Sequence, residues 1–385
     1  MESAAGIRKS NLIRLAIMAV WIGAFTPPAA FAQGAVVSAS PSSQWEAAGF
    51  DHFYSLEYDP AIENFQKLRD AQPSDPSAYN HLASGYFYRQ LLLAGSLEGE
   101  FFTDRNLFSR LKKIQPDPLL KKKFWEANNT AIRLCDQRLK RNKSDQEALY
   151  HCGVSYSDRA AYLGLVERAK FETLASARKA NAYHVQLQRL NPQFYDAYLV
   201  TGVYEYIMGS LPGSLKFLLF LAGFIGDQQR GIHAVEIAAQ QGSRSRQDAK
   251  ILLALIYRRE KRYAESQRIL SELAEAYPRN YIFPLEIASV YQKAGEVKEA
   301  VRTYEQMLDD AQRGKAGYAA APIARVHYAL GELYWKAGEL EPAKLHFDQV
   351  RGSAGGSQEL EIQNEAMRRQ VEQALRERQR PTVVN

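Results

Sequence analysis

The residues best suited to chemistry are seven histidines, and their spacing does not form a catalytic or metal-binding motif. They are spread along the chain at His52, His81, His151, His184, His233, His327 and His346. No His-Glu-x-x-His pattern and no Gly-x-Ser-x-Gly nucleophile turn occurs. The sequence therefore predicts no catalytic, metal or cofactor residues and a protein that is not an enzyme. An active site dispersed over the chain, which no motif would mark, is the alternative.

The two cysteines, Cys135 and Cys152, are candidates for a disulfide. They lie almost equidistant from a polar break at residues 141–145, Arg-Asn-Lys-Ser-Asp. If this break connects two antiparallel helices, the two side chains face each other at the same height. Two buried thiols are the alternative, because helix axes about 8–10 Å apart often leave Cα atoms too far apart to bridge.

The first 32 residues have the pattern of a signal peptide. Arg8 and Lys9 give a basic start, residues 15–25 are apolar, and Ala30 and Ala32 supply the small side chains that a signal peptidase requires. We therefore expect an exported protein, periplasmic or envelope-associated, in a compartment that permits a disulfide. An uncleaved anchor is the alternative, although the apolar run is shorter than the roughly 20 residues of a membrane span.

The composition is that of a globular protein. Of 385 residues, 46% are hydrophobic and 24% are charged, which is too apolar for disorder and too polar for several membrane spans. The net charge of +6 is mild for this length and does not indicate binding of nucleic acid. Nothing in the sequence sets the oligomeric state.

One pattern occurs twice between residues 247 and 308, at an interval of 34 residues. The matching positions are Leu253, Ala254, Tyr257 and Leu270 in the first copy, and Ile287, Ala288, Tyr291 and Tyr304 in the second. The small residues stand where two helices would touch, and the large ones would fill the space around them. A 34-residue period of this kind resembles the tetratricopeptide repeat (TPR), a helix–turn–helix unit.

This resemblance implies an all-α, right-handed helical solenoid of about seven helix pairs, interrupted by insertions at residues 91–120 and 209–227. Helices are expected to resume at residues 121–141 and 231–241. The predicted organisation is a signal peptide (1–32), a flexible lead-in (33–43), TPR-like repeats with insertions (42–246), regular repeats (247–357), a capping helix (358–380) and a disordered tail (381–385).

In the TPR family, partners bind on a concave face lined by the first helix of each repeat. Carrying the family's positions over gives a partner-binding groove with an aromatic N-terminal half and a cationic C-terminal half. Its residues are Phe53, Tyr54, Asn80, Phe87, Tyr88, Tyr150, Tyr206, Arg258, Arg259, Lys293, Tyr328, Trp335 and Lys336. Such a groove suits a peptide with apolar anchors and an acidic or carboxylate end. The alternative is that these aromatic side chains belong to the core, or that the insertions fill the groove.

The second insertion contains the most apolar stretch after the signal peptide, residues 211–225. Its amino-acid sequence is similar to a segment of a fungal and animal TPR family associated with the mitochondrial outer membrane. The matching residues include Lys216, Gly223, Gly226, Asp227 and Gly231. The match covers about thirty residues, and it does not imply that this chain has an activity of that family.

The sequence thus predicts a non-catalytic protein–protein interaction or assembly module of the cell envelope, with a protein or peptide partner. The alternative is a membrane-associated factor that touches lipid through residues 211–225 and a basic helix within residues 110–143. That basic run is also what a solvated helix face would show.

Overall fold

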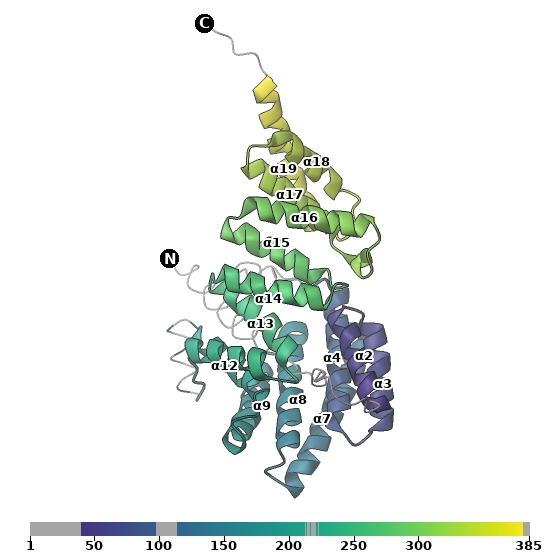
Figure 1. Ribbon diagram of the computed structural model, residues 1–385, viewed down its shortest axis with the longest axis vertical. Helices are drawn as coiled ribbons and strands as arrows, with labels where there is room; N and C mark the ends of the chain where they lie inside the picture. Colours follow the sequence, from purple (N-terminus) through teal and green to yellow (C-terminus); the bar gives the residue numbers. More distant parts are fainter. Residues whose placement is uncertain are drawn as a thin grey trace, which may run out of the picture. The chain divides into compact units, whose positions relative to one another are not determined.

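The computed structural model describes residues 40–97, 114–211, 213, 216, 221 and 223–379 (Figure 1). The predicted signal peptide, most of the lead-in, the middle of the first insertion, half of the apolar stretch and the tail lie outside these residues. The described residues form fifteen α-helices and no strand. They divide into two compact units, Met1–Glu260 (unit 1) and Lys261–Asn385 (unit 2). None of the described helices is long and apolar enough to cross a membrane.

Unit 1 consists of antiparallel helix pairs and one further helix. Successive helices pair in the order α2 with α3, α4 with α7, α8 with α9, and α10 with α12, and α13 follows on α12. Their bounds are α2 (Pro41–Tyr54), α3 (Tyr58–Ala71), α4 (Pro76–Leu93), α7 (Pro118–Arg141), α8 (Gln146–Tyr162), α9 (Lys170–Leu190), α10 (Ala197–Gly209), α12 (Gln228–Gln241) and α13 (Arg246–Arg259). A single π-helical turn, Leu163–Glu167, continues α8.

Aspartate side chains set several helix starts in unit 1. The carboxylates of Asp75, Asp117, Asp145 and Asp227 each accept a backbone N–H in the first turn of α4, α7, α8 and α12. Two helices therefore begin earlier in the chain than the sequence pattern predicts. The helix expected from residue 121 begins at Pro118, and the helix expected from residue 231 begins at Gln228. Helix α2 begins at Pro41, inside the segment predicted to be a lead-in.

Within a pair, a glycine on the first helix lies under a large side chain of the second. A Cβ atom on Gly49 would lie 2.4 Å from Cε1 of Phe65, and one on Gly153 would lie 2.0 Å from Cδ2 of His184. Phe65 and His184 are fully buried. This is the small-against-large packing that the repeat pattern predicts.

Helices α10 and α12 approach each other closely, because their crossing is lined by glycine on both sides. A Cβ atom on Gly231 would lie 2.3 Å from the backbone nitrogen of Tyr206 and 2.6 Å from the carbonyl oxygen of Gly202. Asp227 caps α12, and its own N–H donates to Glu205 Oε2 at 2.7 Å. The Gly226-Asp227 end of the second insertion, and Gly231 just after it on α12, therefore have a packing role.

Unit 2 continues the pairing of antiparallel helices with a regular core. Its helices are α14 (Tyr263–Ala276), α15 (Ile282–Ala294), α16 (Val297–Gln312), α17 (Ile323–Lys336), α18 (Leu340–Val350) and α19 (Gln358–Gln379). Ala288 and Ala300 are fully buried where α15 and α16 touch, and Tyr304 fills the space beside them. Gly295, with φ of 83°, ends α15 in a left-handed conformation that suits glycine.

The last helix closes the core of unit 2. Val371 of α19 is fully buried against Ala343 and Phe347 of α18, and Met367 and Leu375 flank it. Most other side chains of α19 are exposed and polar. A helix with one apolar stripe and a polar outer side is suited to cap a solenoid.

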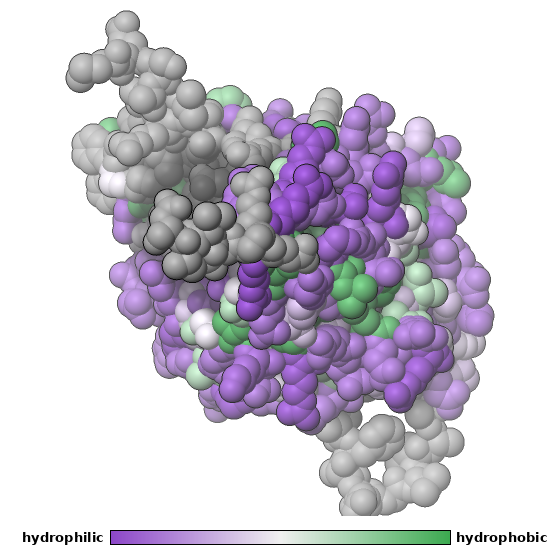
Figure 2. All heavy atoms as spheres, turned by 90° about the horizontal axis from the view of Figure 1, so that it is seen from above, coloured by the Kyte–Doolittle hydropathy of each residue, from purple (hydrophilic) through white to green (hydrophobic). Residues whose placement is uncertain are grey.

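One face of the molecule is largely polar. Figure 2 shows a face on which hydrophilic residues dominate and hydrophobic residues form small separate groups. Scattered apolar residues of this kind are normal on a protein surface.

Candidate partner-binding surface

The aromatic half of the predicted groove lies inside unit 1. Phe53, Tyr54, Asn80, Phe87, Tyr150 and Tyr206 are each at most 4% exposed, and Tyr88 is half-buried. The Phe53 ring packs edge-on against Tyr88 with centroids 5.0 Å apart, and the Phe87 ring lies 5.7 Å from Tyr162. These side chains fill the interior between helices, and their contact with a partner stays a prediction.

Two carboxylates join helices that are distant in sequence within unit 1. The Tyr54 hydroxyl donates to Asp248 Oδ1 at 3.0 Å, which connects α2 to α13 across 194 positions. The Ser84 hydroxyl donates to Asp158 Oδ2 at 2.9 Å and connects α4 to α8. Burial raises the pKa of Asp158 well above its ordinary value. Because Tyr54 lies on the first helix of unit 1 and Asp248 on the last, these two helices contact each other.

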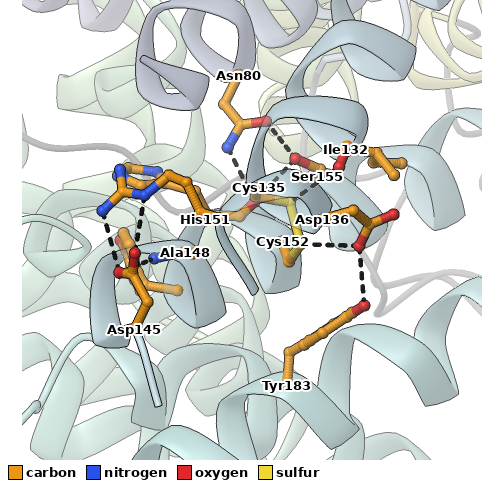
Figure 3. Close-up of a disulfide and its surroundings, with 12 residues drawn as sticks. Asn80, Ile132, Cys135, Asp136, Asp145, Ala148, His151, Cys152, Ser155 and Tyr183 are labelled. Atoms are coloured by element: carbon orange, nitrogen blue, oxygen red, sulfur yellow. Dashed lines mark hydrogen bonds and ion pairs between the residues drawn. A yellow bond between two sulfur atoms is a disulfide. The ribbon is translucent and has the colours of Figure 1, made fainter. Parts of the chain in front are cut away.

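Asn80, another predicted groove residue, uses its amide within the chain. Its Nδ2 donates to the carbonyl oxygen of His151 at 3.1 Å, and its Oδ1 accepts from the Ser155 hydroxyl at 2.6 Å (Figure 3). Both partners lie on α8. The amide therefore fixes α4 against α8.

Tyr150 lies beneath an ion pair that joins α8 to the turn before α13. The guanidinium of Arg244 lies 5.5 Å above the Tyr150 ring and donates from Nη2 to Glu147 Oε1 at 3.0 Å. Burial alone would raise the pKa of Glu147, but hydrogen bonds from His151 and Arg244 outweigh burial and lower that pKa to about 2. The backbone nitrogen of Arg244 donates to Asp196 Oδ1 at 2.7 Å, which adds the start of α10 to the same assembly.

His184 is buried between the backbones of two first helices. Its Nε2 lies 3.0 Å from the carbonyl oxygen of Tyr150, and its Nδ1 lies 3.3 Å from the carbonyl oxygen of Ala197. Burial lowers the pKa of His184 to about 4, although the two carbonyl contacts and Asp196 act in the opposite direction. The imidazole is therefore neutral at pH 7 and serves as a spacer between repeats.

The cationic residues at the end of unit 1 are also engaged. Arg258 is 3% exposed. The Arg259 guanidinium lies 5.5 Å above the ring of Tyr206, whose hydroxyl donates to Glu260 Oε1 at 2.6 Å. These side chains support the end of α10 and α13.

The predicted groove residues of unit 2 fall into two groups. Tyr328 and Trp335 pack toward α18 and α19, where the Tyr328 ring lies edge-on to Phe347 at 5.7 Å. Lys293 and Lys336 are exposed in the last turn of α15 and α17. Within the part of the chain that the structure describes, neither ammonium group has an ion-pair partner. These two lysines are available to an acidic partner.

Cys135 and Cys152 are joined by a disulfide that connects α7 to α8, with Cα atoms 5.7 Å apart (Figure 3). Both residues are fully buried. A bridge across 17 positions stabilises a protein by about 3 kcal/mol, chiefly by restricting the unfolded chain. Asp136 lies beside the two sulfur atoms, and among described residues this is the one group of three potential metal ligands. The bonded sulfur atoms are not free to bind a metal.

The architecture defines the class of protein: an all-helical solenoid of stacked helix–turn–helix pairs. Models of the tetratricopeptide repeat match residues 248–280 and 285–315, which contain most of the two copies of the 34-residue pattern. The chain therefore contains TPR repeats, and TPR repeats are protein–protein interaction modules. No curated protein matches the sequence.

Several solved structures are similar to this chain at low identity. A TPR protein from Parabacteroides merdae is 15% identical, with 87% of this chain and 100% of that chain covered and a TM-score of 0.32. A thermophilic TPR protein from Thermus thermophilus is 14% identical, with 65% and 99% covered and a TM-score of 0.36. Yeast Tom70 is 14% identical, with 99% and 74% covered and a TM-score of 0.43.

Proposed function

We propose that this TPR protein is a non-catalytic interaction or assembly module of the cell envelope that holds a peptide or protein on the concave face of its repeats. The observation that carries the proposal is the pair of regular repeats at residues 248–280 and 285–315. The envelope location rests on the signal-peptide pattern of residues 1–32.

Unit 2 supplies the charge for this role. Lys293 and Lys336 occupy the same turn of two first helices, and both are exposed. In unit 1, by contrast, the corresponding tyrosines and the amide of Asn80 form contacts within the chain. A partner with carboxylate groups would gain charge-assisted hydrogen bonds from the two lysines.

The test is affinity capture from an envelope extract, with residues 33–385 as bait. We expect the double variant Lys293→Glu/Lys336→Glu to recover at least about 10-fold less partner, because like charges then face each other across the contact. The matched control is Lys298→Glu/Arg302→Glu, which makes the same charge change at exposed positions of the second helix α16.

Equal recovery of the partner by the two double variants would show that the lysines do not bind it. Failure of the parent chain to recover any protein would contradict the interaction module itself. Both variants should keep the helical circular-dichroism spectrum of the parent, since none of the four side chains is buried.

A second candidate function is contact with an anionic membrane, favoured by exposed apolar residues in and near the second insertion. Leu221 is 67% exposed and Ile225 is 57% exposed. The Arg178 guanidinium of α9 lies 5.5 Å from the ring of Phe224 between them, so cationic and apolar groups are adjacent. In the basic helix, by contrast, Lys121 is paired with Glu167 at 2.8 Å.

Flotation with phosphatidylglycerol vesicles separates the two functions. For membrane contact we expect bound protein to fall several-fold in Leu221→Ser/Ile225→Ser, because each serine removes an apolar side chain that would enter the lipid. Leu93→Ser is the control, since Leu93 is equally exposed, at 66%, on α4. Absence of flotation at low salt, or equal loss in the control, would rule this candidate out.

A further inference from the structure

Two histidines of unit 2 face each other across a helix pair. Nδ1 of His327 on α17 lies 3.1 Å from Nδ1 of His346 on α18, with ring centroids 5.4 Å apart. Two nitrogen lone pairs repel at this distance, so one proton must lie between them. Within the described chain this is the one hydrogen bond that either ring makes. Both rings are half-buried, so solvent reaches the pair.

The pair is neutral under ordinary conditions. Burial, together with the neighbouring His346, lowers the pKa of His327 to about 4. Burial also lowers the pKa of His346, against the effect of Glu305. A neutral imidazole can release Nδ1 to a metal ion by moving its proton to Nε2 through exchange with water.

We propose that His327 and His346 form a binding site for a divalent transition-metal ion of the Zn²⁺ type, which takes the place of the shared proton. Zinc binds histidine nitrogen at about 2.0–2.1 Å, so two nitrogens on one ion lie roughly 3.0–3.4 Å apart at ordinary coordination angles. The observed 3.1 Å falls in this interval. Each ring needs only to turn about its Cβ–Cγ bond so that the two lone pairs converge.

Water supplies the remaining ligands, because among the described residues no carboxylate joins the two histidines in a group of three potential ligands. Glu305 is exposed on α16, and its Oε1 accepts the Tyr334 hydroxyl at 2.8 Å. The Tyr334 ring stacks on the ring of His346 with centroids 5.5 Å apart, so the Glu305 carboxylate belongs to the surroundings of the pair and is not one of the direct ligands. Two imidazoles with water form a donor set for zinc and its neighbours in the periodic table, and a poor one for Mg²⁺.

A bound ion would connect the two helices of one repeat. It would bind the folded unit and not the unfolded chain, so it would raise the unfolding temperature of unit 2 with increasing metal concentration. The proposal does not depend on partner binding, because the two histidines were not among the predicted groove residues.

The experiment is a calorimetric titration of the full chain, stripped with a chelator, with Zn²⁺ alone and separately with Mg²⁺. We expect one tightly bound Zn²⁺ per chain and no heat with Mg²⁺. His327→Ala and His346→Ala should each weaken zinc binding at least about 10-fold, the loss that even outer-shell changes cause at metal sites. The matched control is His233→Ala, because His233 is exposed in unit 1 beside Glu236, 3.7 Å away.

A second variant separates metal binding from folding. His346→Gln keeps a side chain of similar length that can hydrogen-bond but has little affinity for zinc, and circular dichroism reports whether its helices are intact. Zinc binding that survives in a folded His346→Gln variant, that responds to only one of the two histidines, or that is absent from the parent would each overturn the site. Copper bound in place of zinc should show two nitrogen ligands by electron paramagnetic resonance in the parent and one in each alanine variant.

Discussion

Gly231→Ala is expected to destabilise unit 1 by about 3 kcal/mol or more. The added methyl group would lie 2.3 Å from the backbone nitrogen of Tyr206 and 2.6 Å from the carbonyl oxygen of Gly202. Overpacking of a core usually costs about 1–3 kcal/mol, because side chains can turn away. Here the obstacle is backbone, so α10 and α12 must separate along their length. Urea unfolding measures the change in free energy.

Gly213→Ala is the control for this prediction. Gly213 lies in the second insertion, a short distance before α12, and nothing lies within 4 Å of the position that its Cβ atom would take. We expect its free energy of unfolding to stay within about 0.5 kcal/mol of the parent. A Gly231→Ala protein with parental stability would contradict the close crossing of α10 and α12.

Acid should destabilise unit 1 through His184. The folded pKa of about 4 lies below the ordinary value of about 6.5, so the unfolded chain binds the proton first. Stability is therefore complete above pH 6.5 and falls as the pH is lowered, by about 2 kcal/mol at pH 5 and about 3 kcal/mol at pH 4. Urea unfolding at pH 7.5, 6, 5 and 4 measures this loss.

Comparison with His184→Gln isolates this histidine from the other titrating groups. The glutamine variant should be less stable at pH 7.5, because the Tyr150 and Ala197 carbonyl contacts change, but its stability should decline less steeply toward pH 4. Parallel pH profiles for the two proteins would show that His184 does not carry the effect. Glu147, with a pKa of about 2, adds its own loss only below about pH 4.5.

The fold follows from local pattern to a large extent. Ala288 and Tyr304 stand at fixed positions of a 34-residue repeat, and the small-against-large contact that they predict is the contact that forms. Helix starts were predicted less well, because Asp117 and Asp227 cap their helices about a turn before the apolar pattern begins. The π-helical turn after α8 carries no sequence signal that we can identify.

The candidate site was harder to predict, because periodicity indicates the face of a helix but not what covers that face. Tyr54 and Asp248 are 194 positions apart, and no repeat pattern relates them. Their contact means that first-helix residues of unit 1 point into an interior. Lys293 and Lys336 are exposed because they stand in the last turns of their helices, beyond the apolar contacts.

The histidine pair could have been found from the sequence. His327 and His346 are nearly equidistant from the turn at Ala337 and Gly338, as Cys135 and Cys152 are from theirs. The cysteine pair was predicted from the equal distances of its two residues to the turn of a helical hairpin. Metal ligands, in contrast, were predicted only from spacings within a single helix. Ligand spacing within a helix is therefore too narrow a test for a helical repeat protein.

The hydrogen bond between Tyr54 and Asp248 can form only after most of unit 1 has been synthesised. Helical repeats usually contact only their neighbours, so that each one folds onto the last as the chain emerges. In unit 1 the first helix also contacts the last one, and the 194-residue separation of Tyr54 and Asp248 takes roughly 10–40 s to synthesise. Until Asp248 has been synthesised, the buried Tyr54 hydroxyl lacks this carboxylate partner, although α3 and α4 already cover Phe50 and Phe53 of α2. The contact between the two ends of unit 1 is therefore expected to form last, after the neighbouring helix pairs have packed.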